Sequence, residues 1–405
     1  MAVPCAGRVG RVGALVAVAA TVAPVAHAQI RTVLISPIPG NPSASGDRLL
    51  SGYAAIAGAG STNPFLVKIE PGIYDLKSRT LAMRPFIAIE GSGEAVTIVR
   101  GVAESAGTIA GASDTELRSL TVENTATSSA TALRNDSAGF SAQHVTCVAT
   151  TAGTAIAILQ NARSTVTLRS VTARASGFNA TGIYTQGGLL TDARALVTAG
   201  DLGYAVFNQS STGELIDVSA ETDSGRFAGG IRNEAGAPIL RNVRAAARGV
   251  SVAEAIVNGN ATGAQITGAV IRATASGAGS FAIGVSNEFT SGVIGQADIA
   301  ADGPSGAYGV YNQFSGAPTL LDVRIRATAA GSGIGVVTEN GVTASILNAS
   351  VQGDGASVAN NPGTAAVTRV GSSRLTGPVR AGTGTLTCAA SYNASFAPLG
   401  TACVP

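Results

Sequence analysis

Two aspartates at one position of an internal repeat are the residues with the clearest potential for chemistry. Asp192 and Asp217 are 25 residues apart, and if the repeat stacks, their carboxylates lie about 5 Å apart, the spacing of neighbouring strands. Two carboxylates at that distance either bind a cation such as Ca²⁺ or share a raised pKa. The alternative is that both face water and repel each other weakly. Asp298, Asp302 and Asp322 form a looser set with the same two interpretations.

Aromatic and arginine side chains form a second candidate surface. Tyr184, Phe207 and Arg232 each precede the most regular position of the repeat, and strand alternation points such residues outward. Rings and guanidinium groups side by side on a flat sheet can stack on sugar rings or contact another molecule. The pattern predicts a polysaccharide or cell-surface partner at these three residues, although scattered exposed aromatics are also common in proteins without a ligand.

Histidine and cysteine chemistry is limited by the small number of these residues. His144 is the only histidine after residue 28, which excludes a multi-histidine metal site and leaves any Ser-His-Asp relay dependent on it alone. Its flanks, Gln143 and Val145, favour a surface or turn histidine. Cys147 falls on an inward strand position, where a free cysteine acts as a small hydrophobic residue; a catalytic thiol is the less favoured alternative. We expect no cofactor, apart from Ca²⁺ if Asp192 and Asp217 bind it.

The remaining cysteines of the chain after residue 28 lie near its end. Cys388 and Cys403 are 15 residues apart, and a disulfide between them would contribute roughly 3 kcal/mol in the chain-entropy model. In an exported chain such a pair is expected to be oxidised. We therefore predict that Cys388 and Cys403 are bonded.

An internal repeat of about 25 residues positions all of these side chains. Four-residue segments such as 230–233 (Gly-Ile-Arg-Asn) and 309–312 (Gly-Val-Tyr-Asn) recur at intervals of 23 to 29 residues. A second series, which includes 240–243 (Leu-Arg-Asn-Val), keeps a constant offset of 16 residues from the first. Strands this short cannot bury a face alone and are stable only when they stack on the next turn of the chain.

The repeat predicts an all-β fold, a right-handed parallel β-helix (solenoid) with a short N-terminal capping helix. Parallel crossovers are nearly always right-handed. A leucine-rich repeat has a similar period, but the inward positions here are mostly Val, Ile and Ala rather than a dense ladder of leucines. About ten coils at strand spacing would give a rod roughly 50 Å long.

The last residue of the first series is most often asparagine. Amide side chains stacked at strand spacing can hydrogen-bond one another and the turn backbone. We predict a structural ladder rather than a ligand-binding column, made of Asn135, Asn161, Asn208, Asn233, Asn258, Asn287 and Asn312.

Residues 1–28 have the pattern of a signal peptide. Arg8 and Arg11 precede an apolar run over residues 12–25, and Ala26-His27-Ala28 has the small-x-small pattern of a cleavage site. The mature chain then has 24 basic and 24 acidic residues, which gives no electrostatic footprint of a nucleic-acid-binding protein. No later stretch is apolar enough for a membrane span. We expect a secreted or cell-envelope protein, in the periplasm or on the outer surface.

The rest of the chain divides into three parts. Residues 29–62 are expected to form a linker and an N-terminal cap, in which Asp47 begins a short helix that carries Leu49, Leu50 and Tyr53. Residues 63–370 form the parallel β-helix. Residues 371–405 form a C-terminal cap with the disulfide. Caps are required because open sheet edges invite aggregation.

Two stretches resemble known β-helix proteins. Residues 63–101, with a strand and Pro-Gly turn at 65–74, resemble the first coils of the pectin-lyase-like superfamily, and residues 309–320 are similar to the repeat of bacterial right-handed β-helix surface proteins. The resemblance implies the fold more than an activity. Pectinesterases carry an arginine beside a tryptophan, and this chain has no tryptophan. Polygalacturonases use adjacent aspartates and Gly-His-Gly, and neither string occurs here.

Two functions follow from these observations. The first is a non-enzymatic secreted β-helix, adhesin-like or structural, whose regular face binds polysaccharide or protein. The alternative is a calcium-assisted polysaccharide lyase or hydrolase of the pectin-lyase-like superfamily, with its site near Asp192 and Asp217. The missing motifs favour the first.

Overall fold

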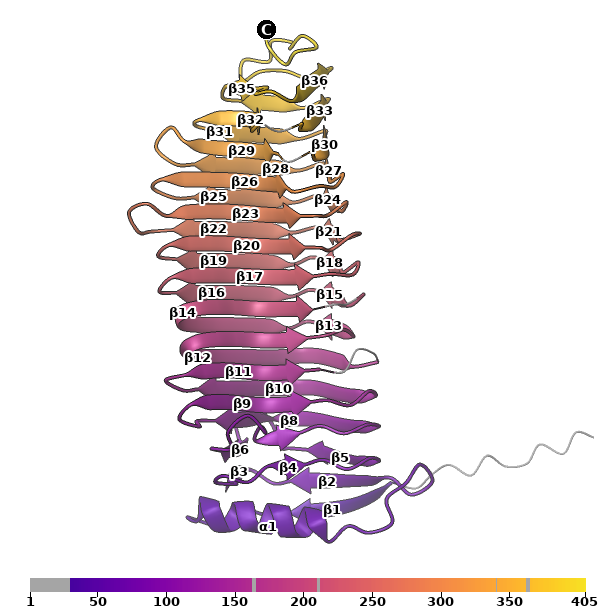
Figure 1. Cartoon of the computed structure of the whole chain (residues 1–405). Helices are drawn as coiled ribbons and strands as arrows, with labels where there is room; N and C mark the ends of the chain where they lie inside the picture. Colours follow the sequence, from indigo (N-terminus) through magenta and orange to yellow (C-terminus); the bar gives the residue numbers. More distant parts are fainter. Residues whose placement is uncertain (1–29, 162–164, 210–211, 340, 362–364) are drawn as a thin grey trace, which may run out of the picture.

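The computed structural model describes residues 30–161, 165–209, 212–339, 341–361 and 365–405. They form a right-handed parallel β-helix of about 12 turns, drawn in Figure 1 as a column of stacked strands. The predicted all-β solenoid is therefore confirmed, including its single short helix. The expected signal peptide lies outside the described residues.

Each coil contributes one strand to each of three faces. In one coil, β15 (Glu214–Ile216) is followed by β16 (Ser219–Ser224) and then by β17 (Phe227–Glu234). Each strand pairs in parallel with the equivalent strand of the next coil. We call the faces built by the equivalents of β17, β15 and β16 face A, face B and face C.

Some strands belong to one face, and four long strands bend from one face into the next. Face A contains β4 (Leu81–Ala82), β7 (Ile109–Ala110), β9 (Ser129–Asn135), β11 (Thr154–Gln160), β17, β20 (Val252–Gly259), β23 (Phe281–Glu288), β26 (Gly306–Gln313), β29 (Gly333–Thr338), β32 (Ala356–Asn360) and β35 (Val379–Arg380). Face B contains β1 (Arg31–Ile35), β2 (Phe65–Ile69), β5 (Ile87–Glu90), β13 (Leu189–Thr191), β15, β18 (Ile239–Arg241), β21 (Gln265–Thr267), β24 (Val293–Gly295), β27 (Thr319–Leu321), β30 (Thr343–Leu347), β33 (Val367–Gly371) and β36 (Thr385–Ala389). Face C contains β3 (Gly72–Asp75), β6 (Thr97–Gly101), β16, β19 (Arg244–Gly249), β22 (Val270–Ala275), β25 (Asp298–Asp302), β28 (Arg324–Thr328), β31 (Ser350–Gly353) and β34 (Arg374–Thr376). The bent strands are β8 (Thr115–Asn124), β10 (Phe140–Thr150), β12 (Thr167–Thr185) and β14 (Arg194–Gln209).

The corner between faces B and C is a single residue with left-handed backbone geometry. The residue at this corner has a φ of 50° at Asp192, 55° at Asp217 and 54° at Asn242. Short polar side chains tolerate this region because they can hydrogen-bond the local backbone. The corner therefore explains why Asp and Asn recur at this position of the repeat.

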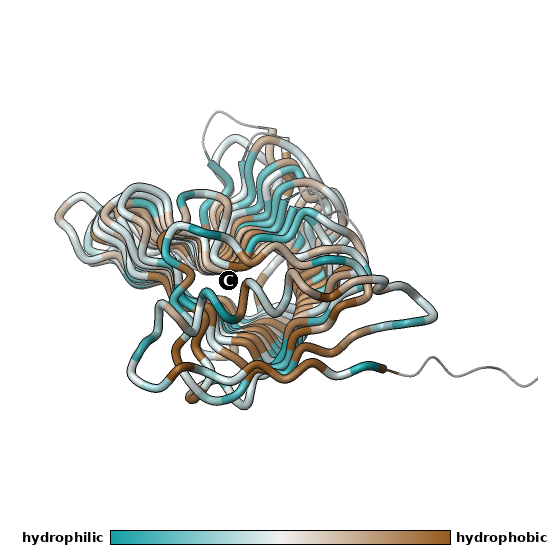
Figure 2. The backbone as a smooth tube through the Cα atoms, turned by 90° about the horizontal axis from the view of Figure 1, so that it is seen from below, coloured by the Kyte–Doolittle hydropathy of each residue, from teal (hydrophilic) through white to brown (hydrophobic). Residues whose placement is uncertain are grey.

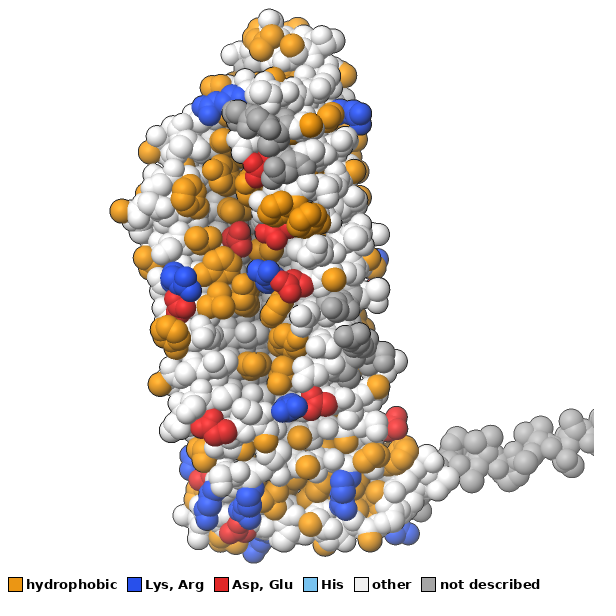
Figure 3. Space-filling model, viewed as in Figure 1, with side chains coloured by type: hydrophobic (Ala, Val, Ile, Leu, Met, Phe, Trp, Pro, Cys, Tyr) orange, Lys and Arg blue, Asp and Glu red, His pale blue; other side chains and the backbone are white. Residues whose placement is uncertain are grey.

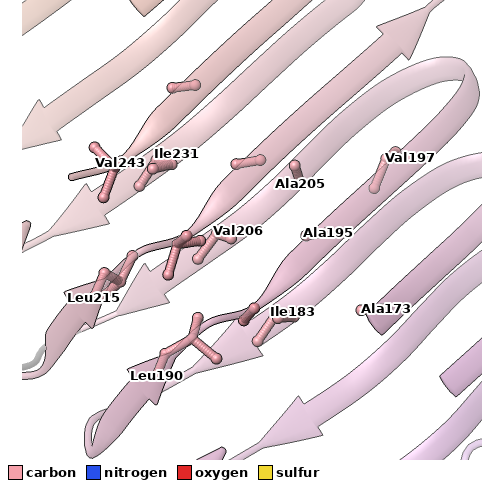
Figure 4. Close-up of a cluster of buried hydrophobic side chains, with 14 of the residues drawn as sticks. Ala173, Ile183, Leu190, Ala195, Val197, Ala205, Val206, Leu215, Ile231 and Val243 are labelled. Carbon is pink, nitrogen blue, oxygen red and sulfur yellow. The ribbon is translucent and has the colours of Figure 1, made fainter. Parts of the chain in front are cut away.

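The core is a thin apolar column between the three faces. Viewed along the axis, the coils superimpose around it (Figure 2). Figure 4 shows Leu190 and Leu215 of face B, Ala195 of face C and Val206 and Ile231 of face A within one buried cluster. Larger side chains are excluded at points of closest approach. At Gly309 an added Cβ would lie 2.2 Å from Ile325 Cγ2.

Asparagine side chains form a buried hydrogen-bonded ladder at the end of the face A strands. Asn208 Nδ2 donates to Asn233 Oδ1 (3.1 Å), Asn233 to Asn258 (2.9 Å), Asn258 to Asn287 (2.9 Å) and Asn287 to Asn312 (2.8 Å). Each asparagine thus donates a hydrogen bond to the amide oxygen of the next, across five successive coils. Asn135 joins an earlier part of the same column by donating to Gln160 Oε1 (2.5 Å).

The prediction that Asn161 belongs to this ladder is wrong. The strand register pairs Asn135 with Gln160, and Gln160 with Thr185. Asn161 comes one residue later, and its side chain donates to Asp136 Oδ1 (2.6 Å) outside the core. Asn135, Gln160 and Thr185 are each 25 residues apart. The coil length therefore places Gln160 in the column, although Asn161 is the asparagine.

Both ends of the solenoid are capped. Helix α1 (Pro42–Ala54) covers the first coil with the buried side chains of Leu49 and Tyr53. Its N-cap is Asn41, whose side chain accepts from Ala44 N (3.0 Å), and not Asp47 as predicted, because Pro42 fits the first helical turn and starts the helix earlier.

The remaining features of the two ends concern the first strand and the disulfide. Strand β1 pairs with β2, so the stacking begins at Arg31, within the segment predicted as linker and cap. At the other end Cys388 and Cys403 are bonded. No helix among the described residues is long and apolar enough to cross a membrane.

The ladder leads to a stability prediction. Asn258→Ala leaves Asn233 Nδ2 and Asn287 Oδ1 buried without partners, which should destabilise the protein by about 2–4 kcal/mol. The matched control Asn161→Ala removes an amide at the surface and should cost under about 1 kcal/mol. Guanidinium unfolding of the full chain, followed by circular dichroism, compares the two midpoints. Equal midpoints would contradict a stabilising ladder.

Candidate functional site

The outward side chains of face A contain the most concentrated set of chemical groups. Strand alternation and parallel register place them in columns along the axis. One column consists of Tyr204, Gly229, Glu254, Ile283 and Tyr308, one residue from each of five consecutive coils. Figure 3 shows acidic, basic and hydrophobic side chains together on this face, at about the level of β17 to β26.

Glu254 stands in an apolar part of that column. Its neighbours along the axis are Gly229 and Ile283, and its own strand contributes the buried Val257. No hydrogen bond or ion pair to its carboxyl group occurs within the described part of the chain. Burial raises the pKa of Glu254 to about 7, with a smaller contribution from the negative charge of Glu288 and an opposing one from Arg232. A large share of this carboxyl group is therefore protonated near neutral pH.

Glu288 supplies a second carboxylate, one coil further along. Gln313 Nε2 donates to Glu288 Oε1 (3.1 Å), which fixes one oxygen. The equivalent residue of the coil before is Gly259, which has no side chain to cover the other oxygen. Oε2 of Glu288 lies 3.8 Å from the point that a Cβ on Gly259 would occupy. The missing side chain leaves this oxygen uncovered on the side of Gly259, and the charge of Glu288 is near enough to raise the pKa of Glu254.

Arg232 lies on β17, one coil before Glu254, whereas Glu288 lies one coil after it. Arg232 Nε donates to Glu234 Oε1 (2.7 Å) and its Nη1 to the hydroxyl of Tyr204 (3.3 Å). Its guanidinium carbon lies 5.7 Å from the centroid of the Tyr204 ring and 5.9 Å from that of Phe207. Tyr204 itself covers Gly229, where an added Cβ would lie 2.4 Å from ring atom Cδ1. The glycine thus lets an aromatic ring and an arginine pack together next to Glu254.

Aromatic rings flank the carboxyl groups on both sides along the axis. Toward the N-terminus, Phe207 contacts Tyr184 (ring centroids 5.4 Å apart) and Tyr204 (5.5 Å). Toward the C-terminus, Tyr308 stacks on Phe281 (6.5 Å) and on Tyr311 (5.3 Å). The structure therefore gives face A a run of rings that is interrupted by Glu254 and Glu288.

The structure brings some of the predicted contact residues together and adds others. Tyr184, Phe207 and Arg232 lie within this run of rings, as the outward register implies. Glu254 and Glu288 were missed, because only the residue before the ladder was treated as outward. Two signals were available in the sequence. Glu254 lies in a further outward column, and glycines replace side chains at positions 229 and 259.

Asp192 and Asp217 do not join this site. Both are exposed at the left-handed corner between faces B and C. Asp192 Oδ2 accepts from Ser170 Oγ (2.8 Å). Ca²⁺ takes six to eight oxygen ligands, and among the residues that the structure describes no group of three or more His, Cys, Asp or Glu side chains is arranged to hold a metal ion.

The other residues singled out by their chemistry are distributed over the solenoid. Asp298 forms an ion pair with Arg272 (2.7 Å), and Asp322 accepts from the Asn348 side chain. His144 is exposed at the corner between faces B and C. Cys147 is fully buried, and burial raises the pKa of its thiol above the usual range, which suits a core residue.

Comparison with known proteins identifies the fold at low sequence identity. No protein-family model matches the chain, and no curated protein matches it. The catalytic unit of a thermostable GH87 α-1,3-glucanase from Streptomyces thermodiastaticus superposes with a TM-score of 0.50 and 12% identity, over 86% of this chain and 67% of the glucanase. The A-module of a mannuronan C-5 epimerase from Azotobacter vinelandii gives a TM-score of 0.49 and 14% identity, over 86% and 95% of the two chains. A DFA-IIIase from Arthrobacter chlorophenolicus gives 0.42 and 13%, over 84% and 94%.

The glucanase is an enzyme by name, and this comparison overturns the prediction of a non-enzymatic adhesin or structural spacer. The prediction rested on the absence of two known motif sets, and that absence does not exclude a site made of other residues. The coil register, the three faces and the superposition agree on one conclusion. The chain has a right-handed parallel β-helix fold like that of the glucanase, as the resemblance to pectin-lyase-like proteins implied.

Proposed function

We propose that the protein is a glycoside hydrolase that cleaves a polysaccharide bound along face A. The observation that carries the proposal is Glu254, a carboxyl group with a pKa of about 7 and no hydrogen-bond partner among the described residues, within reach of the charge of Glu288. Most glycosidases use two carboxyl groups of this kind, one protonated and one ionised. A strongly perturbed acid in a surface lined with rings is also a general sign of a functional site.

The two carboxyl groups have separate roles in the proposed reaction. Glu254 donates its proton to the glycosidic oxygen as the bond from that oxygen to the anomeric carbon breaks. Glu288 either removes a proton from the attacking water or attacks the anomeric carbon itself. In both cases one water molecule is consumed and its two hydrogens end on the two products. Arg232 balances part of the negative charge around Glu254 through its contact with Glu234.

The rings on either side supply the binding surface. Tyr184, Tyr204 and Phe207 lie on one side of Glu254, and Tyr308 and Tyr311 on the other. Rings of this type bury the apolar faces of sugars while their hydroxyl groups remain available for hydrogen bonds. Because the flanks lie along the axis, the proposed substrate is a chain that crosses several coils rather than a single sugar.

Two further points support the choice of reaction and place. The enzymatic alternative included a hydrolase and a calcium-assisted lyase. The pair Glu254 and Glu288 suits hydrolysis. The calcium site expected at Asp192 and Asp217 consists of two exposed carboxylates at a different corner of the coil. The pattern at Ala26-His27-Ala28 supports export, so we propose an enzyme that acts outside the cytoplasm.

The first prediction concerns the two carboxyl groups. Glu254→Gln and Glu288→Gln should each lower kcat by roughly 10²–10⁴-fold, the usual contribution of an acid or base. Release of reducing ends is measured on a polysaccharide panel that includes α-1,3-glucan, the substrate in the glucanase's name. Glu221→Gln on face C is the matched control and should keep full activity.

The roles can be separated with aryl glycosides. Their leaving groups depart without protonation, so the loss in Glu254→Gln should largely disappear on them, whereas the loss in Glu288→Gln should remain. Unchanged hydrolysis in both variants would contradict the proposed site. A lyase also releases a reducing end, so the products are examined for ultraviolet absorbance as well, and an unsaturated product would assign the protein to the lyases.

The pH dependence of activity gives a second prediction. The reaction needs protonated Glu254, so kcat/KM should fall as pH rises through about 7, the pKa of this group. The falling limb should move when the variant Ile283→Ser makes the surroundings of Glu254 more polar, because the pKa then returns toward its ordinary value. A limb that stays in place in Ile283→Ser would assign it to another group.

The same group predicts a pH dependence of stability. Burial raises the pKa of Glu254 from 4.5 to about 7, so the folded state binds more protons than the unfolded state between these values. The contribution of this group to stability is therefore greatest below about pH 4.5 and is lost as pH rises to about 7, by about 3 kcal/mol. Unfolding midpoints at several pH values should show this loss in the wild type and not in Glu254→Gln. Parallel curves for the two proteins would contradict the raised pKa.

A further inference from the structure

Two exposed phenylalanines stack on each other at the edge of face A. The rings of Phe289 and Phe314 have centroids 4.7 Å apart and are nearly parallel, with an interplanar angle of 9°. Their residues remain 48% and 43% exposed, so each ring keeps much of its area in water. Folding alone gives no reason to leave a paired aromatic surface in solvent.

Their backbone geometry strengthens this point. Phe289 has a φ of 53° and Phe314 a φ of 73°, in the left-handed region that bulky residues avoid. The equivalent residues of the two preceding coils, Ala235 and Asn260, have a φ of 63° and 52°. The turn therefore has this geometry in four successive coils, and the small Ala235 and the well-suited Asn260 meet it at lower steric cost. Strain of this kind is retained at functional sites.

The pair lies beside Glu288, one of the two proposed catalytic groups. Phe289 follows Glu288 in the chain, and Phe314 follows Gln313, whose amide holds Glu288. Phe289 N donates to Gln313 O (3.3 Å), so the two turns are joined in register with the strands. The two rings thus extend the aromatic surface of face A beyond the C-terminal ends of β23 and β26, next to the carboxylate of Glu288.

The charge of this region restricts what the rings can receive. On face A, the outward side chains of β17, β20, β23, β26 and β29 and the residue that follows β29 include four carboxyl groups and one guanidinium. The carboxyl groups are those of Glu234, Glu254, Glu288 and Glu339, and the guanidinium is that of Arg232. Arg232 already contacts Glu234, and Glu339 accepts from the Tyr311 hydroxyl. A sugar with its own carboxylate would meet surplus negative charge here.

We propose that Phe289 and Phe314 form the platform of a sugar subsite next to Glu288 that binds an uncharged sugar ring. The substrate class is accordingly a neutral glycan and not a polyuronate. The inference rests on the proposed hydrolase function for its biological meaning, but the binding step can be tested without catalysis.

The test replaces each phenylalanine by a residue that the turn accepts. Phe289→Asn and Phe314→Asn should weaken binding to a neutral glucan roughly threefold to tenfold, the value of one aromatic contact. Their melting temperatures should stay equal to the wild type or rise, because asparagine suits the left-handed geometry. Phe396→Asn is the matched control. Phe396 is also left-handed (φ 61°) and 67% exposed, but it packs on Arg374 in the C-terminal cap.

Affinity electrophoresis of the full chain measures binding to dextran, pullulan, laminarin and α-1,3-glucan as neutral probes, and to polygalacturonate and alginate as acidic ones. Weaker binding of at least one neutral probe in both variants, with the control unchanged, supports the platform. Equal affinity of variants and wild type, no binding to any neutral probe, or preference for an acidic probe overturns it. Loss of a dimer in the variants, measured by light scattering, would instead assign the rings to a contact between copies and also overturns it.

The outcomes separate the two proposals. If the phenylalanine variants lose binding while Glu254→Gln and Glu288→Gln leave hydrolysis unchanged, the subsite stands and the assignment of the carboxyl groups fails. If the carboxyl variants lose activity and the phenylalanine variants bind as the wild type does, the hydrolase stands and the platform fails. Binding should be retained in Glu254→Gln, which also provides an inactive form for these measurements.

Discussion

The parallel hydrogen bonding between successive coils is the constraint on which the rest of the structure depends. Each residue lies about 4.8 Å from its equivalent in the next coil, so any side chain that recurs in the repeat becomes a column. Inward columns must be apolar or must satisfy themselves, as the amides from Asn208 to Asn312 do by donating in one direction along the axis. Outward columns carry no such requirement, and they are where the repeat can vary without loss of the fold.

In the candidate site, positions without a side chain matter as much as the functional groups. Gly229 leaves room for the ring of Tyr204, and Gly259 leaves an oxygen of Glu288 uncovered. Ile283 and Val257 keep water away from Glu254, which raises the pKa of its carboxyl group. The same carboxyl group between two polar neighbours would be an ordinary surface glutamate. The reactivity proposed for Glu254 is therefore a property of the coils before and after it, joined by a register that the asparagine ladder helps to fix.

This origin explains how far the sequence could predict the molecule. The 25-residue period, the asparagines and the terminal cysteines are local patterns, and they were sufficient for the solenoid, for most of the ladder and for the disulfide. Asn161 was misplaced by one residue because matching amides was given priority over keeping the period constant. Glu254 was missed for a different reason. Its distinguishing feature is the combination of Gly229 and Ile283, which are distant in sequence and become neighbours only when the register is known residue by residue.

Left-handed positions show how a structural cause and a functional one can be told apart in a repeat. At the corner between faces B and C the residues with this geometry include Asp192, Asp217, Asn242 and Asp322, side chains that the backbone itself favours. Their recurrence needs no ligand, which removes the main reason for a cation site at the two aspartates. At the turn after face A the geometry is the same, but Phe289 and Phe314 are side chains that it disfavours. A residue that agrees with its backbone is explained by the fold, whereas one that opposes it calls for another cause. For Phe396 that cause is its contact with Arg374 in the C-terminal cap, and for Phe289 and Phe314 we propose the sugar subsite next to Glu288.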